Sequence, residues 1–400
     1  MKVPFTWKVT GWFMIGWSPE FPVGETKALK YFGEDLVGYR DESGALHVME
    51  AHCKHLGAHL GHGGKVVGDC VECPFHGWRW GPDGNNTYIP YQPDRPNRGL
   101  HLRVYPVMEQ YDCVFIWHHP LGLEPQWDMP DIFKSFPQYE TDPKAYYRPY
   151  PEFSRLAENE PVHPQIVAEN GPDSAHFQYV HRATVTPKLL EWNIVDQEWR
   201  FLTGWPVADS ADPDQMALRI HSNMFGLGGA ISVFEGQSNH RLIFACTPVD
   251  DEVSNMFYSI WEPRVPGDES DVPPDAVRKR IEKQFLVTVW DDLEIWRYQK
   301  YVEHPALSRV DAKPYMALRK WATQFYDTSP TSPPNDTSPT SPPNDTSPTS
   351  PPNDTSPTSP PNDTSPTSPP NDTSLTNSSD GVAPNRGTTT AAPSSVSSSA

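Results

Sequence analysis

Residues 48–80 read VMEAHCKHLGAHLGHGGKVVGDCVECPFHGWRW. Two short Cys/His pairs stand out in this stretch, Cys53-x-His55 and Cys73-x-x-His76, with 17 residues between them. Thiolates and imidazoles are the side chains that most often bind iron or zinc in proteins. The stretch therefore predicts a metal site with four protein ligands, two from each pair.

The residues around the two pairs have the pattern of β-hairpins. Ala45–Met49 and Lys65–Cys70 alternate apolar and polar side chains, as half-buried strands do. Several glycines and one proline lie between these segments and predict turns: Gly57, Gly61, Gly63, Gly64 and Pro74. Each ligand pair is therefore expected at the tip of a hairpin.

The spacing of the ligands favours an iron–sulfur cluster over zinc. In a Rieske-type [2Fe–2S] cluster two thiolates hold one iron, while two imidazoles hold the other and raise its reduction potential. A zinc site with two Cys and two His is the alternative, but its paired ligands usually have at least two residues between them. A single residue separates Cys53 from His55, so we predict a [2Fe–2S] cluster on Cys53, His55, Cys73 and His76.

A second group of possible metal ligands lies in residues 169–181, which read ENGPDSAHFQYVH. Asn170, Gly171 and Pro172 predict the start of a helix there. On such a helix Asp173 would share a face with His176, three residues on, and could orient its imidazole.

His181 lies five residues after His176, which is about 140° around a straight helix. Both imidazoles can reach one metal only if the helix ends or distorts between them. The following residues, Ala-Thr-Val-Thr-Pro at 183–187, favour such an end.

A helix expected over Asp275–Tyr301 offers the carboxylate that a site with two histidines needs. Its apolar stripe includes Ile281, Phe285, Thr288 and Trp296, and Asp292 falls near the centre of that stripe at about 100° per residue. An acid on an apolar stripe is costly unless it is paired or bound to metal. The helix also has apolar residues on its other side, so the periodicity favours Asp292 over Asp291 without excluding the latter.

Across residues 1–326 the chain resembles the Rieske non-haem iron oxygenases. The cluster motif and the pattern Glu-Asn-x-x-Asp-x-x-His-x-x-x-x-His carry this resemblance. It implies that His176, His181 and Asp292 bind a mononuclear Fe(II), because Asp-Leu-Glu-Ile-Trp at 292–296 is similar to the family's Asp-Val-x-Ile-Trp. It also implies a homotrimer in which Asp173 bridges a cluster histidine of a neighbouring subunit to His176.

The expected fold class is α+β with three parts. An all-β Rieske domain is expected over 1–125. The resemblance implies a helix-grip catalytic domain over 126–326, in which an antiparallel sheet surrounds a long helix and the substrate cavity lies over the iron. Residues 327–371 repeat Asp-Thr-Ser-Pro-Thr-Ser-Pro-Pro-Asn five times. With so little to bury, 327–400 is expected to be a disordered low-complexity tail.

Three stretches are similar to the oxygenase component of 3-ketosteroid 9α-hydroxylases and to Rieske sterol desaturases: PFHGWRWG at 74–81, HPAL at 304–307 and LRKWATQFY at 318–326. This likeness implies a monooxygenase that uses O₂ to hydroxylate an apolar substrate, a 3-ketosteroid of sterol catabolism. Electrons would come from NADH through a separate flavin/iron–sulfur reductase. A sterol desaturase and an aryl O-demethylase share the same ligands. An electron-transfer or redox-sensing Rieske protein is the alternative outside enzymes.

Charge and cysteine content limit which partners the protein can bind and where in the cell it is expected. The formal charge is −19, of which seven Asp and one Arg place −6 in residues 327–400. So acidic a protein is not expected to bind nucleic acid or anionic membranes. Neither a signal peptide nor a membrane span is recognisable, so the cytoplasm is the expected location. Cys70 is expected to be a strand residue next to the cluster site, whereas Cys113 and Cys246 lie in strand-like apolar stretches and are expected to be buried thiols.

Overall fold

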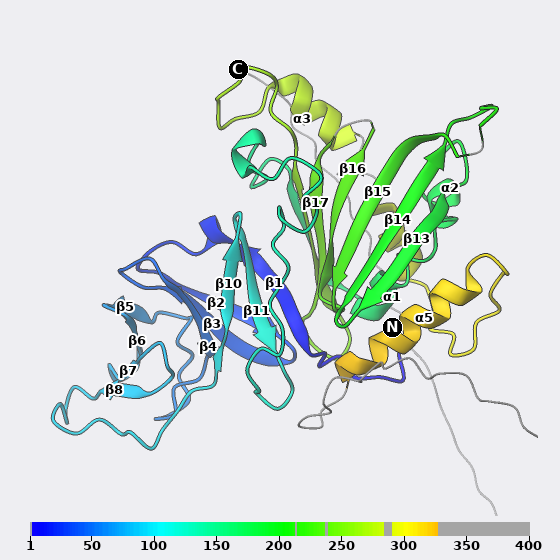
Figure 1. Cartoon of the computed structure of the whole chain (residues 1–400). Helices are drawn as coiled ribbons and strands as arrows, with labels where there is room; N and C mark the ends of the chain where they lie inside the picture. The colour runs from blue at the N-terminus through cyan, green and yellow to red at the C-terminus, as the bar shows by residue number, and fades with distance from the viewer. Residues whose placement is uncertain (1, 213, 237–238, 284–289, 327–400) are drawn as a thin grey trace, which may run out of the picture. The chain divides into compact units, whose positions relative to one another are not determined.

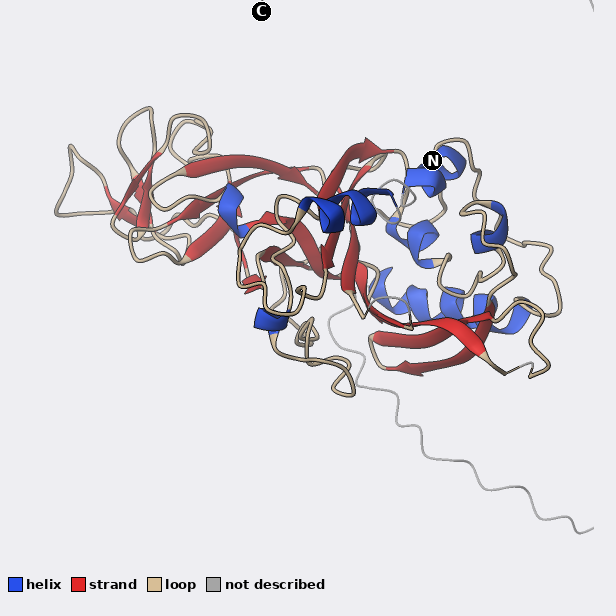
Figure 2. Cartoon of the chain, turned by 90° about the horizontal axis from the view of Figure 1, so that it is seen from above, coloured by secondary structure: helices blue, strands red, loops and turns tan. Residues whose placement is uncertain are grey.

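The computed structural model describes residues 2–212, 214–236, 239–283 and 290–326 (Figure 1). All of these residues belong to one compact unit. The predicted disordered tail, 327–400, lies outside the described residues. Figure 2 shows strands and loops at one end of this unit and most helices at the other, and in the element order β1 to β11 precede α1.

The N-terminal part consists of three small antiparallel sheets, which confirms the predicted all-β domain. The first has the order β1-β11-β10, the second β2-β3-β4-β9 and the third β5-β6-β7-β8. Their strands are β1 Gly11–Trp17, β2 Thr26–Tyr31, β3 Glu34–Arg40, β4 Leu46–Glu50, β5 Lys65–Val67, β6 Cys70–Glu72, β7 Arg79–Trp80, β8 Asn86–Tyr88, β9 Val104–Tyr105, β10 Val107–Gln110 and β11 Cys113–His118. The single strand predicted over Lys65–Cys70 was wrong, because Gly68 adopts φ +64° and turns β5 into β6.

The C-terminal part is built on one seven-stranded antiparallel sheet with the order β12-β18-β17-β16-β15-β14-β13. Its strands are β12 Ser154–Glu160, β13 Lys188–Val195, β14 Glu198–Pro206, β15 Met216–Phe225, β16 Gly229–Glu235, β17 Arg241–Pro248 and β18 Ser254–Trp261. The α-helices are α1 Pro164–Ala168, α2 His176–Tyr179, α3 Asp275–Ile281, α4 Asp291–Trp296 and α5 Ala312–Ala322. An antiparallel sheet with helices against it confirms the predicted α+β class.

The helix expected over Asp275–Tyr301 is described in two pieces, α3 and α4. Residues 284–289, which include two members of the predicted stripe, lie outside the described residues. The predicted end was wrong, because α4 stops at Trp296 and the next main-chain hydrogen bonds tighten into turns. Within the described ranges, no helix is both long enough and apolar enough to span a bilayer.

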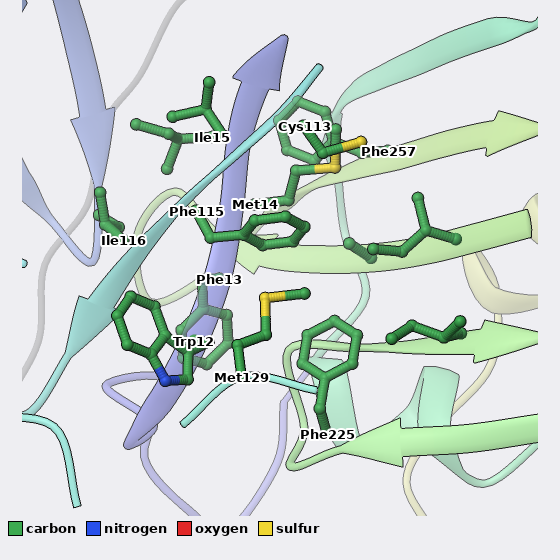
Figure 3. Close-up of a cluster of buried hydrophobic side chains, with 14 of the residues drawn as sticks. Trp12, Phe13, Met14, Ile15, Cys113, Phe115, Ile116, Met129, Phe225 and Phe257 are labelled. Carbon is green, nitrogen blue, oxygen red and sulfur yellow. The ribbon is translucent and has the colours of Figure 1, made fainter. Parts of the chain in front are cut away.

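The two parts share one hydrophobic core (Figure 3). Side chains of β1, such as Trp12 and Phe13, pack with Phe115 of β11 and with Phe225 and Phe257 of the large sheet. Two hydrogen bonds also join residues distant in the sequence: the indole of Trp17 donates to Ser259 Oγ at 2.8 Å, and the Thr10 amide donates to the Phe325 carbonyl at 2.9 Å. A domain boundary between 125 and 126 stays a prediction, since this core continues on both sides of it.

Arg241, at the start of β17, is completely buried. Its guanidinium donates to the main-chain carbonyls of Ile132, Phe136 and Glu140 at 3.2, 3.4 and 2.7 Å. It also lies over the ring of Phe133 at 5.0 Å. This one side chain therefore supplies the donors for a loop that would otherwise present unpaired carbonyls to the core.

We expect Arg241→Leu to lower the free energy of unfolding by about 3 kcal/mol, because each buried carbonyl left without a donor costs about 1–3 kcal/mol. Arg219→Leu is the matched control, since Arg219 makes a partly exposed ion pair with Glu235 at 3.5 Å. That control should cost less than about 1 kcal/mol. Urea denaturation followed by tryptophan fluorescence measures both, and equal losses in the two variants would contradict the structural role of Arg241.

Candidate metal centres and pocket

The first candidate centre lies on two loops with the same main-chain closure. Cys53 begins the first loop and Cys73 the second, and both thiols are buried. In each loop the glycine four residues after the cysteine donates its N–H to the cysteine carbonyl, at 2.9 Å for Gly57 and 3.0 Å for Gly77. Both glycines have positive φ, +76° and +70°, which other residues rarely adopt. The loops follow β4 and β6, as the predicted hairpin tips require.

The two imidazoles of these loops lie together, with the ring centroids of His55 and His76 4.6 Å apart. His55 also stacks on Trp78 at 4.6 Å with an interplanar angle of 4°. The Nδ1 atoms of both histidines are buried and have no hydrogen-bond partner among the described residues. Such nitrogens are costly unless they bind something, so both are free to ligate a metal.

The thiols fit the same interpretation. Burial raises the pKa of the Cys53 thiol, and the neighbouring Cys73 adds to this effect. A bound cation, such as an iron of a cluster, would offset this effect and favour the thiolate. Cys70 instead opens β6, with its sulfur 3.1 Å from Asp69 Oδ1, and Cys113 and Cys246 are buried in β11 and β17. The prediction that these three are strand residues is confirmed.

The second candidate centre consists of His176, His181 and Asp292. One possible ligand atom from each lies within 4.8 Å of the other two. The Nε2 atom of His181 is 3.2 Å from Oδ2 of Asp292, a separation typical of two ligands of one ion with bonds of about 2.1 Å. Asp291, the alternative on the same helix, is not among the residues that line the cavity, and its Oδ2 lies 3.7 Å from Nη1 of Arg182. The structure thus brings together the three residues that the sequence predicted.

The end of α2 explains how two histidines five residues apart reach one point. His176 is the first residue of α2, and the helix ends at Tyr179. Arg182 then adopts φ +58°, and the amide of Ala183 donates to the carbonyl of Phe177 at 3.0 Å. The chain therefore bends back after the helix, which places His181 beside His176 with their ring centroids 5.3 Å apart.

The predicted helix start at Asn170 was wrong. Residues 169–175 form the connection between α1 and α2, since the amide of Gly171 donates back to the carbonyl of Ala168 and Pro172 has no N–H to continue the helix. The contacts between Asp173 and His176 also differ from the predicted one, in which the carboxylate orients the imidazole. Nδ1 of His176 donates to the main-chain carbonyl of Asp173, and the carboxylate accepts the amide of His176 at 3.3 Å.

This arrangement has a clear consequence for His176. Because Nδ1 carries the donated proton, the lone pair of its imidazole is on Nε2. Burial lowers the pKa of His176, so the neutral ring that can bind a metal is the form present at neutral pH. The three residues therefore fit a divalent ion: two neutral imidazoles and one carboxylate are the ligands that non-haem iron sites use.

Packing and ion pairs hold the segments that carry these ligands. In α4, Leu293 and Trp296 are buried against α1 and the sheet, which leaves Asp292 on the pocket side. Arg297, directly after α4, binds both carboxylate oxygens of Glu160 at 2.7 and 2.8 Å.

A second ion pair supports the segment that carries His176. Arg319 of α5 binds the buried Glu169 at 2.9 Å, and Glu169 is the first residue of the connection to α2. These supporting ion pairs could not be predicted from the sequence. Both arginines lie near recognised motifs, but motifs alone do not indicate which distant acid each one meets.

A cavity of about 340 Å³ opens beside the second centre. Its helical side includes Phe177, His176, His181 and Asp292, and its other side is the face of the large sheet. The remaining lining residues are mostly apolar: Val167, Asn170, Gly171, Ala183, Phe201, Thr203, Trp205, Leu218, Ile220, Ser222, Met224, Ala230, Ser232, Phe234, Leu242, Phe244 and Tyr258. The volume is near the lower end of the range for small-molecule sites, about 300–1,000 Å³.

Strands β15, β16, β17 and β18 each contribute to the sheet side of the cavity, and residues 226–228 turn between β15 and β16. Strand β14 contributes as well. Phe201, Thr203 and Trp205 alternate along it, and that period of two would have predicted a shared face.

Comparison with known families agrees with both centres. Residues 11–106 match the family described as the Rieske [2Fe-2S] domain. Residues 116–326 match the family described as the 3-ketosteroid 9α-hydroxylase C-terminal domain, which alone covers more than half of the chain.

Individual relatives cover most of the chain. A cholesterol 7-desaturase of Xenopus laevis is 29% identical over 80% of this chain and 72% of its own length. The oxygenase component of a 3-ketosteroid-9-alpha-monooxygenase of Rhodococcus rhodochrous is 28% identical over 79% of this chain and 83% of its own.

Among solved structures, dicamba monooxygenase bound to dicamba has a TM-score of 0.59 with 19% identity, over 80% of this chain and 98% of that chain. At that identity the likeness shows the fold. Together with the two family matches, it shows that the chain belongs to the Rieske non-haem iron oxygenases with a C-terminal domain of the 3-ketosteroid 9α-hydroxylase type: it is an oxidoreductase that carries a [2Fe–2S] cluster and a mononuclear iron.

Proposed function

We propose that this chain is the terminal oxygenase of a multicomponent Rieske monooxygenase in the cytoplasm. A separate flavin/iron–sulfur reductase supplies electrons from NADH, and the oxygenase uses them with O₂ to hydroxylate a neutral, apolar substrate, a 3-ketosteroid. The observation that carries the proposal is the largely apolar cavity that opens directly onto His176, His181 and Asp292.

In this proposal Cys53, His55, Cys73 and His76 hold the cluster, and His176, His181 and Asp292 hold the mononuclear iron. When bound, these groups supply one-electron transfer and the activation of O₂. The protein holds the imidazole of His176 neutral, with its lone pair on Nε2, and lines the cavity with rings such as Phe177 and Trp205 that exclude water.

The charge of the cavity supports a neutral substrate. Among the described residues that line it there is no Lys or Arg, and residues 284–289 contain none in the sequence. A carboxylated aromatic substrate would lack a cationic partner there, and an unpaired buried charge is costly. A neutral polycyclic skeleton has no such requirement. The names of two relatives, a 3-ketosteroid monooxygenase component and a cholesterol desaturase, support the same substrate class.

A homotrimer is part of the proposal, with Asp173 between a cluster histidine of a neighbouring subunit and His176. Exposed apolar side chains occur at both ends of that route, which supports such a contact. Leu56 and Phe75, each next to a cluster histidine, are 65% and 60% exposed, and Tyr179, near the second centre, is 80% exposed.

A sterol desaturase is the second candidate, favoured by the 29% identity to a cholesterol 7-desaturase. It would use the same ligands and cavity, and only the outcome at the substrate carbon differs. An aryl O-demethylase shares the ligands as well. An electron carrier without chemistry of its own is disfavoured, because it would have no use for a second group of ligands beside an apolar cavity.

We expect purified protein to contain three irons per chain and Asp292→Ala to contain two, with the EPR signal of the cluster unchanged. The loss follows because the variant removes the one anionic ligand of the second centre. Asp291→Ala is the matched control and should keep all three irons. Iron analysis with EPR measures both, and full iron content with normal activity in Asp292→Ala would refute the assignment.

Asp173→Ala should keep three irons, because the main-chain carbonyl that holds His176 remains in the variant. Turnover should fall by about a hundredfold or more, since the carboxylate proposed to carry the electron is removed. Stopped-flow oxidation of the pre-reduced cluster would report that step directly. Glu294→Ala, which removes an exposed carboxylate paired with Arg297, is the control that should behave as wild type. Normal turnover in Asp173→Ala would exclude the bridging role.

A substrate panel distinguishes the candidate reactions. With a surrogate reductase, we expect O₂ uptake to rise at least about tenfold with 3-ketosteroids and a hydroxylated product to form, because the described lining of the cavity is mostly apolar and contains no Lys or Arg. An unsaturated product from sterols would instead identify a desaturase. Stimulation by methoxy-aromatics and by no steroid would favour the O-demethylase. Mass spectrometry of the products separates these outcomes.

A further inference from the structure

The register of the large sheet places two serines at the centre of the cavity floor. Ser222 of β15 pairs directly with Ser232 of β16. In the same row across the sheet, Phe201 of β14 flanks one serine and Leu242 of β17 flanks the other. All four side chains line the cavity.

The neighbouring rows of the floor are apolar beside the two serines. Ile220 pairs with Phe234 in one row and Met224 with Ala230 in the other, and all of these residues line the cavity. Polar side chains return only towards the ends of these rows, at Thr203 and Tyr258. The two serines are therefore a polar pair surrounded by apolar side chains.

Hydrogen-bond counting shows what this pair can offer. The two hydroxyl oxygens are 2.8 Å apart, and both residues are buried, with 4% and 6% of their surface exposed. Each hydroxyl has one hydrogen, and a single hydrogen is used between the two oxygens. In the part of the chain that the structure describes, the second hydrogen has no other acceptor. One O–H donor and several lone pairs thus remain available to a molecule in the cavity.

The sheet itself gains little from the pair. Replacing both partners of a buried hydrogen bond by apolar groups of similar shape is often nearly neutral for stability. An unused hydroxyl hydrogen beside an apolar ligand is unfavourable, whereas one that meets a ligand oxygen is satisfied. The pair has no formal charge, so it suits a neutral oxygen better than a carboxylate.

We propose that Ser222 and Ser232 together bind the ketone or hydroxyl oxygen of the substrate and so determine which carbon faces His176, His181 and Asp292. The inference rests on the proposed function, since it assigns a polar end to the neutral, apolar substrate of the same cavity. The serines act in orientation and specificity and take no part in the oxidation.

The test compares two ligands that differ in one oxygen, a 3-ketosteroid and its 3-deoxy analogue, by equilibrium dialysis against the iron-loaded enzyme. The wild type should bind the ketone about fivefold more tightly, which corresponds to one neutral hydrogen bond. In Ser222→Ala/Ser232→Ala the two dissociation constants should differ by less than about twofold, while that of the deoxy analogue is unchanged.

A second pair of serines in the same sheet provides the matched control. Ser154 of β12 and Ser259 of β18 are also buried, with their hydroxyl oxygens 2.9 Å apart, but neither is among the residues that line the cavity. Ser154→Ala/Ser259→Ala should keep the fivefold preference. Loss of the preference in this control as well would attribute the effect to the sheet and overturn the proposal.

The outcomes separate the two levels of inference. A preference that survives in Ser222→Ala/Ser232→Ala, or equal binding of both ligands to the wild type, overturns the serine anchor and leaves the proposed function intact. Failure of the wild type to bind either steroid overturns the proposed substrate class, and the anchor with it. Product analysis adds an independent readout: the variant should oxidise more than one position of the ketone, because its orientation is no longer fixed.

Discussion

The geometry of the second centre depends on one contact, in which His181 lies 3.2 Å from Asp292. These two residues are far apart in the sequence. His181 follows α2 and Asp292 lies in α4, and both helices are short. Short helices are not stable alone, so their positions come from tertiary contacts. The buried face of α4 packs on the sheet. Arg297, which follows α4, binds Glu160, and Arg319 of α5 binds Glu169, which precedes α2.

Ion pairs of this kind, in which the carboxylate is buried, contribute orientation more than stability. Removing a carboxylate from water costs roughly what its attraction to an arginine returns. A pair with two oxygens and two nitrogens in contact nevertheless permits only one orientation of the chain. The oxygenase thus holds its ligands with groups that do not line the substrate cavity, so the cavity can change without altering them.

The sequence was most informative where chemistry is encoded locally. Cys53-x-His55 and Cys73-x-x-His76 predicted the first centre because each pair fits within one tight loop. The five-residue spacing of His176 and His181 correctly required the helix to end, but its start at His176 depends on the turn that Gly171 and Pro172 make. The role of the Asp173 carbonyl was not predictable, since side-chain patterns do not report main-chain acceptors. Strand register likewise decides that Ser222 meets Ser232, and register depends on the whole sheet.

The absence of Lys and Arg from the described lining of the cavity has a further consequence for how a neutral ligand enters it. Residues 1–326 are acidic overall, yet a neutral ligand experiences no long-range attraction or repulsion from that charge. The binding of such a ligand should therefore be insensitive to ionic strength. The heat-capacity change of binding should be negative, because apolar surface leaves water. Substrate capture would then be governed by solubility and partitioning from lipid rather than by electrostatic steering.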